Sequence, residues 1–294
     1  MDDELRRAIE AAVGAGGAAQ WSRLGATGWA HASSLDANGH RYFVKIASGP
    51  AADMIVCEAD GLRALSDTRA IRVPAVAASG TSGSSAFLVV EWLEIVAPAN
   101  ARLGVALARL HRAPTPCGPR GERFGWERDN WIGATPQANA WSDDWGAFFR
   151  DRRLAPQLAL AIANGFGDQL AADGERLLTA VPALLRGHEP APSLVHGDLW
   201  TGNAATLANG ALAVFDPAVH VADREIDLAM SELFAGFDAG LRHAYEAQWP
   251  LEEGYPLRRD LYNCYHLLNH VNLFGHGYVA RARKTIAALV ASAH

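Results

Sequence analysis

The chain has 294 residues, and its 26 lysine and arginine residues against 32 aspartate and glutamate residues give a formal charge of −6. This acidic balance excludes a basic nucleic-acid-binding protein as the default interpretation. Hydrophobic residues make up 50% and charged residues 20%, a composition typical of globular proteins and not of disordered chains. Because a chain of this length exceeds one core of usual size, we expect two lobes or domains.

The cysteines and the amino terminus indicate a reducing compartment. Cys57, Cys117 and Cys264 lie far apart and form no CxxC pair, so neither a disulfide framework nor a zinc knuckle is predicted. The first residues are acidic, unlike a signal peptide, and no apolar run approaches the ~18 residues of a membrane span. We therefore expect a cytoplasmic monomer that binds neither nucleic acid nor membrane.

The first third of the chain has the pattern of short β-segments. Asn38-Gly39 suits a tight hairpin turn before a strand over residues 41–46. Further strands are predicted over residues 71–76 and 86–90. Between the strands over 41–46 and 71–76, apolar residues at helical spacing predict a single helix over residues 53–65.

From residue 100 onward the pattern is mainly helical. It begins with a leucine stripe over residues 103–110 and ends with a segment over 257–290 that Gly275 and Gly277 interrupt. Two short strands, 193–195 and 211–215, each run into a polar segment that contains an aspartate. The sequence thus predicts an α+β fold with a small β-rich lobe (1–93) and a larger, mainly helical lobe (94–294) that carries both of these polar segments.

The most specific motif is His-Gly-Asp-Leu-Trp-Thr-Gly-Asn at residues 196–203, with Asp216 following 13 positions after Asn203. Phosphoryl transfer by kinases uses such a set, with one carboxylate beside the acceptor hydroxyl and an amide and a second carboxylate on magnesium. We therefore expect Asp198 to be the catalytic carboxylate, and Asn203 and Asp216 to hold Mg²⁺ against the phosphates of ATP. The alternative is a loop in which these residues only cap turns.

Two charged residues of the first lobe fit the same chemistry. Lys45 lies on a predicted strand, and Glu58 lies 13 residues later on the predicted helix. A kinase needs a phosphate-binding lysine and an orienting carboxylate in such positions. Without the motif at 196–203, ordinary solvated charges would be the better interpretation.

Two other segments are candidates for nucleotide contacts. Gly25 and Gly28 occupy the place of a glycine-rich phosphate loop, but they do not form a GxGxxG pattern, and a simple turn remains the alternative. Residues 89–93 are a candidate hinge in which the backbone of Glu91 and Leu93 meets the adenine edge. A strand that leaves a core would have the same pattern.

These residues resemble the fructosamine and ketosamine kinases, a family within the protein-kinase-like superfamily that also holds aminoglycoside phosphotransferases and choline kinases. The resemblance extends beyond the shared aspartates and asparagine, because it includes Trp200 and Asp216-Pro217-Ala218. It covers residues 45–278. Further matching segments are 124–126, 129–133, 135–137, 144–149, 223–230 and 268–275.

The resemblance implies a two-lobed protein-kinase-like fold and ATP-dependent phosphorylation of the 3-hydroxyl of ketoamines, the adducts of reducing sugars with amines. The unstable 3-phosphate product then decomposes, which amounts to deglycation. Carried over by position, Asp198 is the base or the orienting carboxylate, Asn203 and Asp216 are magnesium ligands, and Lys45 contacts phosphate with Glu58 as its partner. The first lobe would then bind the nucleotide, and the second would carry the catalytic loop and the substrate site. Trp200 would stack on the substrate, and Asp129 would pair with its ammonium group.

Other interpretations stay open from the sequence. An aminoglycoside or choline phosphotransferase of the same fold is the main alternative, and a non-enzymatic kinase-like scaffold is the second. His266 and His270 have a spacing that suits a metal, although a structural role fits better because no further ligand completes a set. The tryptophans at 126, 131, 141 and 145 are candidates for core packing or for substrate contact.

Overall fold

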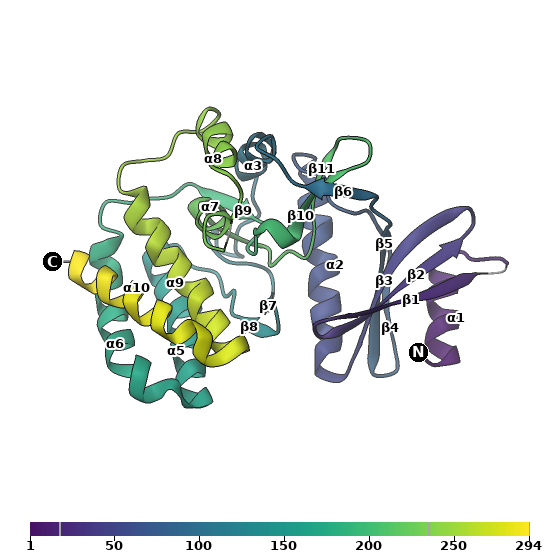
Figure 1. The fold of residues 1–294 in the computed structure, drawn as a ribbon, viewed down its shortest axis with the longest axis horizontal. Helices are drawn as coiled ribbons and strands as arrows, with labels where there is room; N and C mark the ends of the chain where they lie inside the picture. Colours follow the sequence, from purple (N-terminus) through teal and green to yellow (C-terminus); the bar gives the residue numbers. More distant parts are fainter. Residues whose placement is uncertain (18, 235, 294) are drawn as a thin grey trace. The chain divides into compact units, whose positions relative to one another are not determined.

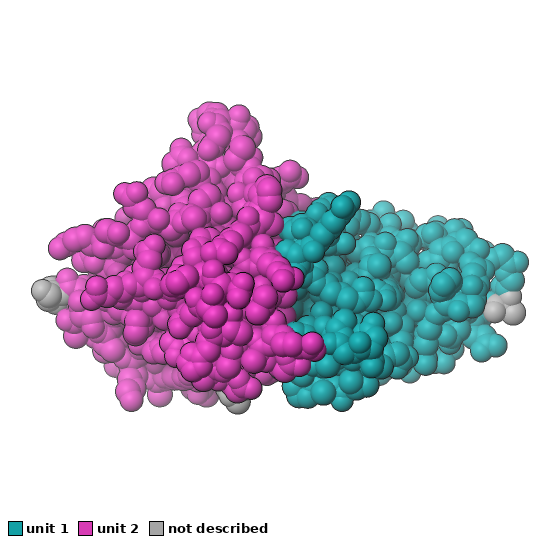
Figure 2. Space-filling model, turned by 90° about the horizontal axis from the view of Figure 1, so that it is seen from above, with its two compact units in different colours: residues 1–99, 203–217 teal, residues 100–202, 218–294 magenta. Residues whose placement is uncertain are grey.

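The computed structural model describes residues 1–17, 19–234 and 236–293, and the chain divides into two compact units. The first unit comprises residues 1–99 and 203–217, and the second comprises 100–202 and 218–294 (Figures 1 and 2). Residues 94–99 and 203–217 therefore pack with the first unit, whereas the sequence places them in the second lobe. Within the described residues, no helix has the length and apolar character needed to cross a membrane.

The first unit contains an antiparallel sheet in the order β1-β2-β3-β5-β4. Its strands are β1 (Gln20–Thr27), β2 (Ala30–Ala37), β3 (His40–Ser48), β4 (Val76–Ser82) and β5 (Ser85–Glu91). Asn38 and Gly39 form the β2–β3 turn with φ angles of 54° and 76°. This left-handed pair is what a two-residue hairpin turn requires, so the predicted hairpin is confirmed, as are the strands over 41–46 and 86–90.

Two helices accompany this sheet. The predicted helix is confirmed as α2 (Ala52–Asp67), which follows the short turn η1 (Gly49–Ala51). The prediction of a single helix is wrong, because α1 (Asp3–Ala12) precedes the sheet. The Asp2 carboxylate caps it by accepting the Leu5 N–H at 2.7 Å, and Leu5 and Ile9 pack into the core of this unit.

The predicted strand over residues 71–76 is wrong, because β4 begins only at Val76. Pro74 has no N–H for a ladder, whereas β4 is an edge strand in which small and polar residues are tolerated. A second sheet of this unit has the order β11-β10-β6. Its strands are β6 (Ile95–Pro98), β10 (Ala204–Leu207) and β11 (Leu212–Val214).

The second unit is mainly helical. Its helices are α3 (Leu103–His111), α4 (Trp145–Phe149), α5 (Ala155–Ala161), α6 (Gly167–Leu184), α7 (Glu225–Ser231), α8 (Ala239–Glu246), α9 (Tyr255–Phe274) and α10 (Val279–Ser292). The π-helical turns η2 (Arg150–Leu154) and η3 (Ile162–Phe166) join α4, α5 and α6. The 3₁₀ turn η5 (Gly275–Tyr278) separates α9 from α10, so the predicted interruption of the last helical segment is confirmed.

Two short antiparallel pairs complete the second unit. β7 (Asn130–Ile132) pairs with β8 (Thr135–Gln137), and β9 (Pro192–Val195) pairs with β12 (His220–Asp223). Because β9 ends at Val195, the motif at 196–203 begins at a buried strand end and closes with the turn η4 (Thr201–Asn203). A large core cluster of this unit draws residues from α5, α6, α9 and α10.

One buried histidine of this core should make the protein sensitive to acid. Burial lowers the pKa of His266 to about 3, so the unfolded chain binds a proton here between about pH 6.5 and 3 that the folded chain excludes. The free energy of unfolding should therefore decrease as the pH is lowered through that window, by up to ~1.4 kcal/mol per pH unit for such a group. Denaturant titrations at pH 5 to 7 would show a smaller pH slope in His266→Leu than in the wild type. His40→Gln, a histidine replacement at an exposed position, is the control variant.

Candidate active site

A cavity of about 440 Å³ lies within the first unit. Its apolar lining suits a flat aromatic base and consists of Phe43, Pro74, Val90, Trp92, Leu93, Ile95 and Phe215. Lys45, Glu58 and Asp216 contact one another and form its charged end, and Glu91 and Glu94 are its other charged lining residues. The cavity therefore combines an apolar slot with a charged end inside one unit.

Lys45 is held between two carboxylates. Its Nζ lies 2.8 Å from Glu58 Oε1 and 2.5 Å from Asp216 Oδ1, and only 6% of its side chain is exposed. Burial alone would lower the pKa of Lys45, but the charges of Glu58 and Asp216 outweigh it and raise the pKa. Burial raises the pKa of Glu58 to about 7, with Lys45 opposing the shift. The ammonium group is thus fixed in the lining of the cavity by two carboxylates.

Asp216 has a special backbone and an accessible carboxylate. Its φ of 56° is in the left-handed region, which aspartate and asparagine tolerate better than most residues. Its side chain is 46% exposed. The carboxamide nitrogen of the buried Asn203 lies 3.5 Å from the Asp216 carbonyl, and the Phe215 N–H donates to the Asn203 carbonyl at 3.0 Å.

The group around Asp216 has the donor types that magnesium requires. Asp216 supplies a carboxylate and Asn203 a carboxamide oxygen, both hard oxygen ligands. Asp216 contacts the lysine that would contact phosphate, and the Asn203 carboxamide lies near the Asp216 carbonyl. The residues present therefore fit a Mg²⁺ ion. Their role as its ligands stays a prediction.

The candidate hinge lines the cavity but is partly engaged within the protein. The Glu91 N–H donates to the Ala75 carbonyl at 2.9 Å, and the Glu91 carboxylate pairs with Arg72 at 2.5 Å. The Leu93 carbonyl accepts the Ile95 N–H at 3.0 Å. Any contact from Glu91 to a base must therefore use a group other than its N–H or its side chain. The adenine contact of Glu91 and Leu93 stays a prediction.

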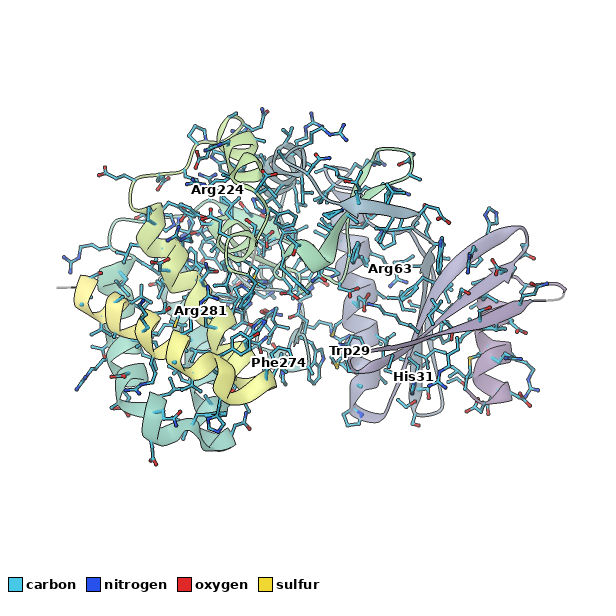
Figure 3. All side chains as sticks on the ribbon, in the orientation of Figure 1. Trp29, His31, Arg63, Arg224, Phe274 and Arg281 are labelled. Atoms are coloured by element: carbon cyan, nitrogen blue, oxygen red, sulfur yellow. The ribbon has the colours of Figure 1, made fainter. Side chains whose placement is uncertain are left out.

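Gly25 and Gly28 lie in the β1–β2 hairpin and are absent from the cavity lining. Gly28 and Trp29 form its two-residue turn, and Figure 3 labels Trp29 there. Gly25 and Gly28 have positive φ angles, of 129° and 58°. The hairpin turn explains why glycine is favoured at position 28, and a register shift in the β1–β2 pairing explains why it is favoured at position 25. Their contact with phosphate stays a prediction.

The catalytic-loop motif in the second unit has an anchored backbone. The N–H groups of His196 and Gly197 donate to the two oxygens of Asp227, at 2.7 and 2.8 Å. Gly197 has a φ of 81°, and a Cβ at this position would lie 2.1 Å from the Ala218 carbonyl oxygen, so only glycine fits. The Asp198 N–H donates to His196 Nδ1 at 3.3 Å, which places His196 as a brace for Asp198.

Asp227 is the buried residue on which this loop depends. It lies on α7, is inaccessible to solvent, and also pairs with His111 Nε2 of α3 at 3.1 Å. Burial alone would raise the pKa of Asp227, but the hydrogen bond and charge of His111 and its contacts with His196 hold the pKa below the usual value. A charged carboxylate thus fixes the two backbone amides before Asp198.

Replacement of Asp227 by asparagine should destabilise the protein. A carboxamide offers one acceptor oxygen and turns an NH₂ group toward a backbone donor, so we expect a loss of ~2–4 kcal/mol in the free energy of unfolding. Misplacement of Asp198 should also lower kcat. Denaturant unfolding with steady-state kinetics would measure both. Asp238→Asn is the matched control, because asparagine caps a helix as well as aspartate does, and an equal effect in both variants would contradict the anchoring role.

Trp200 projects an indole that is 40% exposed, an unusual degree for this residue. A Cβ at Gly202 would lie 2.4 Å from the indole ring, so the absent side chain at Gly202 gives the ring room to fold over the loop. Asp129 is also exposed, and one of its oxygens accepts the Asn139 N–H at 2.8 Å. The substrate roles of Trp200 and Asp129 stay predictions.

The segment after Asp129 is tied to the chain next to the catalytic loop. Asn130 Nδ2 donates to the Val219 carbonyl at 2.7 Å, and Gln137 Nε2 donates to Asn130 Oδ1 at 2.8 Å. The Ala218 N–H in turn donates to the His196 carbonyl at 2.8 Å. The motif segments at 130–137 and 196–203 are therefore connected through residues 218 and 219.

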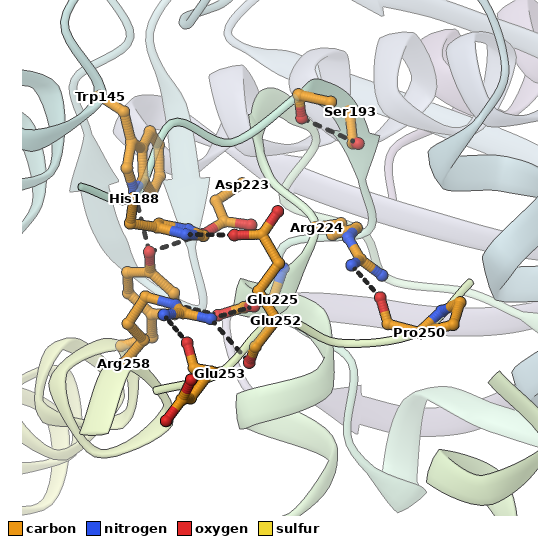
Figure 4. A network of polar contacts seen from close by, with 12 residues as sticks. Trp145, His188, Ser193, Asp223, Arg224, Glu225, Pro250, Glu252, Glu253 and Arg258 are labelled. Carbon is orange, nitrogen blue, oxygen red and sulfur yellow. Dashed lines mark hydrogen bonds and ion pairs between the residues drawn. The ribbon is translucent and has the colours of Figure 1, made fainter. Parts of the chain in front are cut away.

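A buried ionic network fixes the start of α7 (Figure 4). Asp223 accepts hydrogen bonds from His188 Nε2 and from the Tyr262 hydroxyl, both at 2.6 Å, and Arg258 holds Glu225 through two contacts of 2.7 and 2.8 Å. Burial would raise the pKa of Asp223, but the bond to His188 outweighs it and lowers the pKa. Because Arg258 already neutralises Glu225, this cluster supports α7 structurally.

Several contributors to the site were not foreseen from the sequence. Asp227, His111 and Asn130 contact groups 30 to 116 positions away in the chain, and no local spacing reveals such partners. Of the predicted site residues, Lys45, Glu58, Asn203 and Asp216 lie together in the first unit. The second unit carries Asp198, Trp200 and Asp129.

The histidine pair and one of the four tryptophans now have structural explanations, and the alternatives for the tryptophans at 126, 131 and 141 stay open. His270 Nδ1 donates to the His266 carbonyl at 2.8 Å, and within the described residues neither histidine belongs to a cluster that could hold a metal. Trp145 is buried and donates to the Tyr262 hydroxyl at 2.9 Å, which makes it a core residue.

Comparison with known proteins gives a consistent result. Residues 1–292 match the family model described as fructosamine kinase. A probable ketoamine kinase of Synechocystis is 44% identical over 251 residues (84% of this chain, 82% of the relative), and the protein-ribulosamine 3-kinase of Arabidopsis thaliana is 39% identical over 282 residues (92% and 83%). A Thermobifida fusca structure assigned as a fructosamine-3-kinase has a TM-score of 0.84 and 31% identity, covering 99% of each chain. The aminoglycoside phosphotransferase APH(4)-Ia, with 18% identity, a TM-score of 0.66 and coverage of 97% and 98%, shares the protein-kinase-like fold.

Proposed function

Because the chain belongs to the fructosamine kinase family and is thus an ATP-dependent phosphotransferase, we propose that it phosphorylates the 3-hydroxyl of ketoamines and so starts their deglycation. The observation that carries this proposal is the lysine between two carboxylates at the charged end of the cavity. The names of the curated relatives, ketoamine kinase and ribulosamine 3-kinase, favour sugar–amine adducts as the substrate class.

In this proposal the first unit binds the nucleotide. The apolar wall takes the base, Lys45 contacts phosphate oxygens, and Glu58 keeps Lys45 in position. Asn203 and Asp216 would hold Mg²⁺, which supplies positive charge that offsets the charge developing on the transferred phosphoryl group.

The second unit prepares the acceptor. Asp198 orients the substrate hydroxyl and takes its proton, and Asp227 and His196 hold the loop from which Asp198 acts. The indole of Trp200 would cover the sugar, and Asp129 would pair with the cationic amine.

The test is to incubate the enzyme with ATP, Mg²⁺ and a panel of synthetic ketoamines built on six-, five- and four-carbon sugars, and to locate the phosphate by NMR. Turnover of ketoamines with the phosphate on the 3-oxygen supports the proposal. Turnover of aminoglycosides or choline without turnover of ketoamines would replace it with the alternative of the same fold.

Replacement of Trp200 by alanine should raise KM for the ketoamine by ~10-fold and leave KM for ATP unchanged, because a stacked aromatic face contributes ~1–2 kcal/mol to such contacts. Steady-state kinetics with each substrate varied would show the difference. Trp200→Phe is the control, since it keeps an aromatic face and should retain most of the affinity. An equal rise in both KM values would contradict the stacking role.

A further inference from the structure

The chain contains very few lysines. Of its 26 basic residues, Lys45 and Lys284 are the lysines, and all the others are arginines. A lysine amine condenses with the carbonyl of a reducing sugar, whereas the guanidinium group remains protonated and is a poor nucleophile toward such sugars. The two lysines therefore decide where sugars can modify the side chains of this protein.

The two lysines lie in opposite environments. Lys284 is exposed on α10, and no ion pair or hydrogen bond of its side chain is present among the described residues. Lys45 is 6% exposed, and its ammonium group contacts Glu58 at 2.8 Å and Asp216 at 2.5 Å. We propose that Lys284 is the side-chain glycation site of this protein, and that Glu58 and Asp216 shield Lys45 from the same reaction.

The chemistry explains the shielding. Glycation requires the free amine, whose lone pair attacks the sugar aldehyde; loss of one water gives an imine, and a hydrogen shift from C2 to C1 converts it into a ketoamine without any oxidant. Burial keeps the aldehyde away from Lys45, and the Glu58 and Asp216 side chains lie against its Nζ at 2.8 and 2.5 Å. The phosphate-contact lysine thus withstands the sugars from which ketoamines form.

The experiment is to incubate the full chain with ribose and no nucleotide, and then to locate adducts by peptide mapping and mass spectrometry. In the wild type we expect adducts at Lys284 and on the α-amino group, and none at Lys45. Lys284→Arg should lose the side-chain adduct, and Arg283→Lys, which adds a neighbouring exposed lysine, should gain one. Modification of Lys45 as fast as that of Lys284, or an unmodified Lys284, would overturn the proposal.

Two variants test the shielding. Glu58→Ala and Asp216→Gly each remove a side chain that covers the Lys45 Nζ and should raise its modification several-fold. If circular dichroism shows that Glu58→Ala does not fold, Asp216→Gly decides alone, because 46% of the Asp216 side chain is exposed and glycine accepts its φ of 56°. No increase at Lys45 in the folded variants would refute the shielding. Mapping of the sugar adducts does not depend on phosphoryl transfer. An enzyme that proves inactive on ketoamines would contradict the proposed function, but the adduct map would still test the glycation proposal.

Discussion

Replacement of Asp198 by asparagine should lower kcat by ~10³-fold and change the affinity for ATP by less than about twofold. The asparagine keeps the size and hydrogen-bonding geometry of the side chain but cannot accept the hydroxyl proton, and general-base contributions are typically 10²–10⁴-fold. Single-turnover kinetics would measure the chemical step, and a calorimetric titration with ATP and Mg²⁺ would measure binding.

The structure indicates that Asp198→Asn should change the chemistry without displacing the loop. The loop around Asp198 is held by hydrogen bonds from the His196 and Gly197 N–H groups to Asp227, which the substitution does not touch. The exposed Asp143 provides a matched control, since Asp143→Asn should leave both kcat and ATP binding unchanged. Near-normal turnover by Asp198→Asn would remove this carboxylate from the mechanism.

Replacement of Asp216 by asparagine should abolish the magnesium-dependent part of nucleotide binding, with Kd for ATP in the presence of Mg²⁺ rising ~100-fold or more. Asp216→Ala should have the same effect, but alanine at a φ of 56° adds ~1 kcal/mol of backbone strain that asparagine largely avoids. Asparagine is therefore the cleaner variant. Titrations of ATP with Mg²⁺ and with a chelator would separate metal-dependent from metal-independent binding.

Two controls accompany this prediction. Asp67→Asn lies at the exposed end of α2 in the same unit and should bind ATP like the wild type. The wild type with a chelator should resemble Asp216→Asn with Mg²⁺. Retention of the full magnesium effect in Asp216→Asn would show that the ion is held elsewhere.

Patterns confined to neighbouring residues predicted the fold well. The hairpin at Asn38-Gly39, α2 and the break at Gly275 all follow from turn chemistry or helical periodicity. The strand over 71–76 failed because the apolar run was weighted above Pro74, and α1 was missed because its apolar side consists of Leu5 and Ile9 within an otherwise polar segment.

The site could be predicted only as far as the chemistry of single residues allows. Lys45 and Glu58 were chosen for charge and spacing, and the structure places their side chains 2.8 Å apart. Asp227 could not be assigned a role, because its partners are backbone amides whose position depends on the pairing of β9 with β12. An engaged N–H such as that of Glu91 is likewise invisible without coordinates.

The lysine at position 284 also has a practical consequence. Amine-reactive dyes or sensor-chip coupling under mild conditions would attach the folded protein through this residue on α10 and through the α-amino group. Adding a reversible block of the α-amino group would leave a single attachment point. Fluorescence or surface-based measurements would then observe every molecule in the same orientation, without an engineered tag.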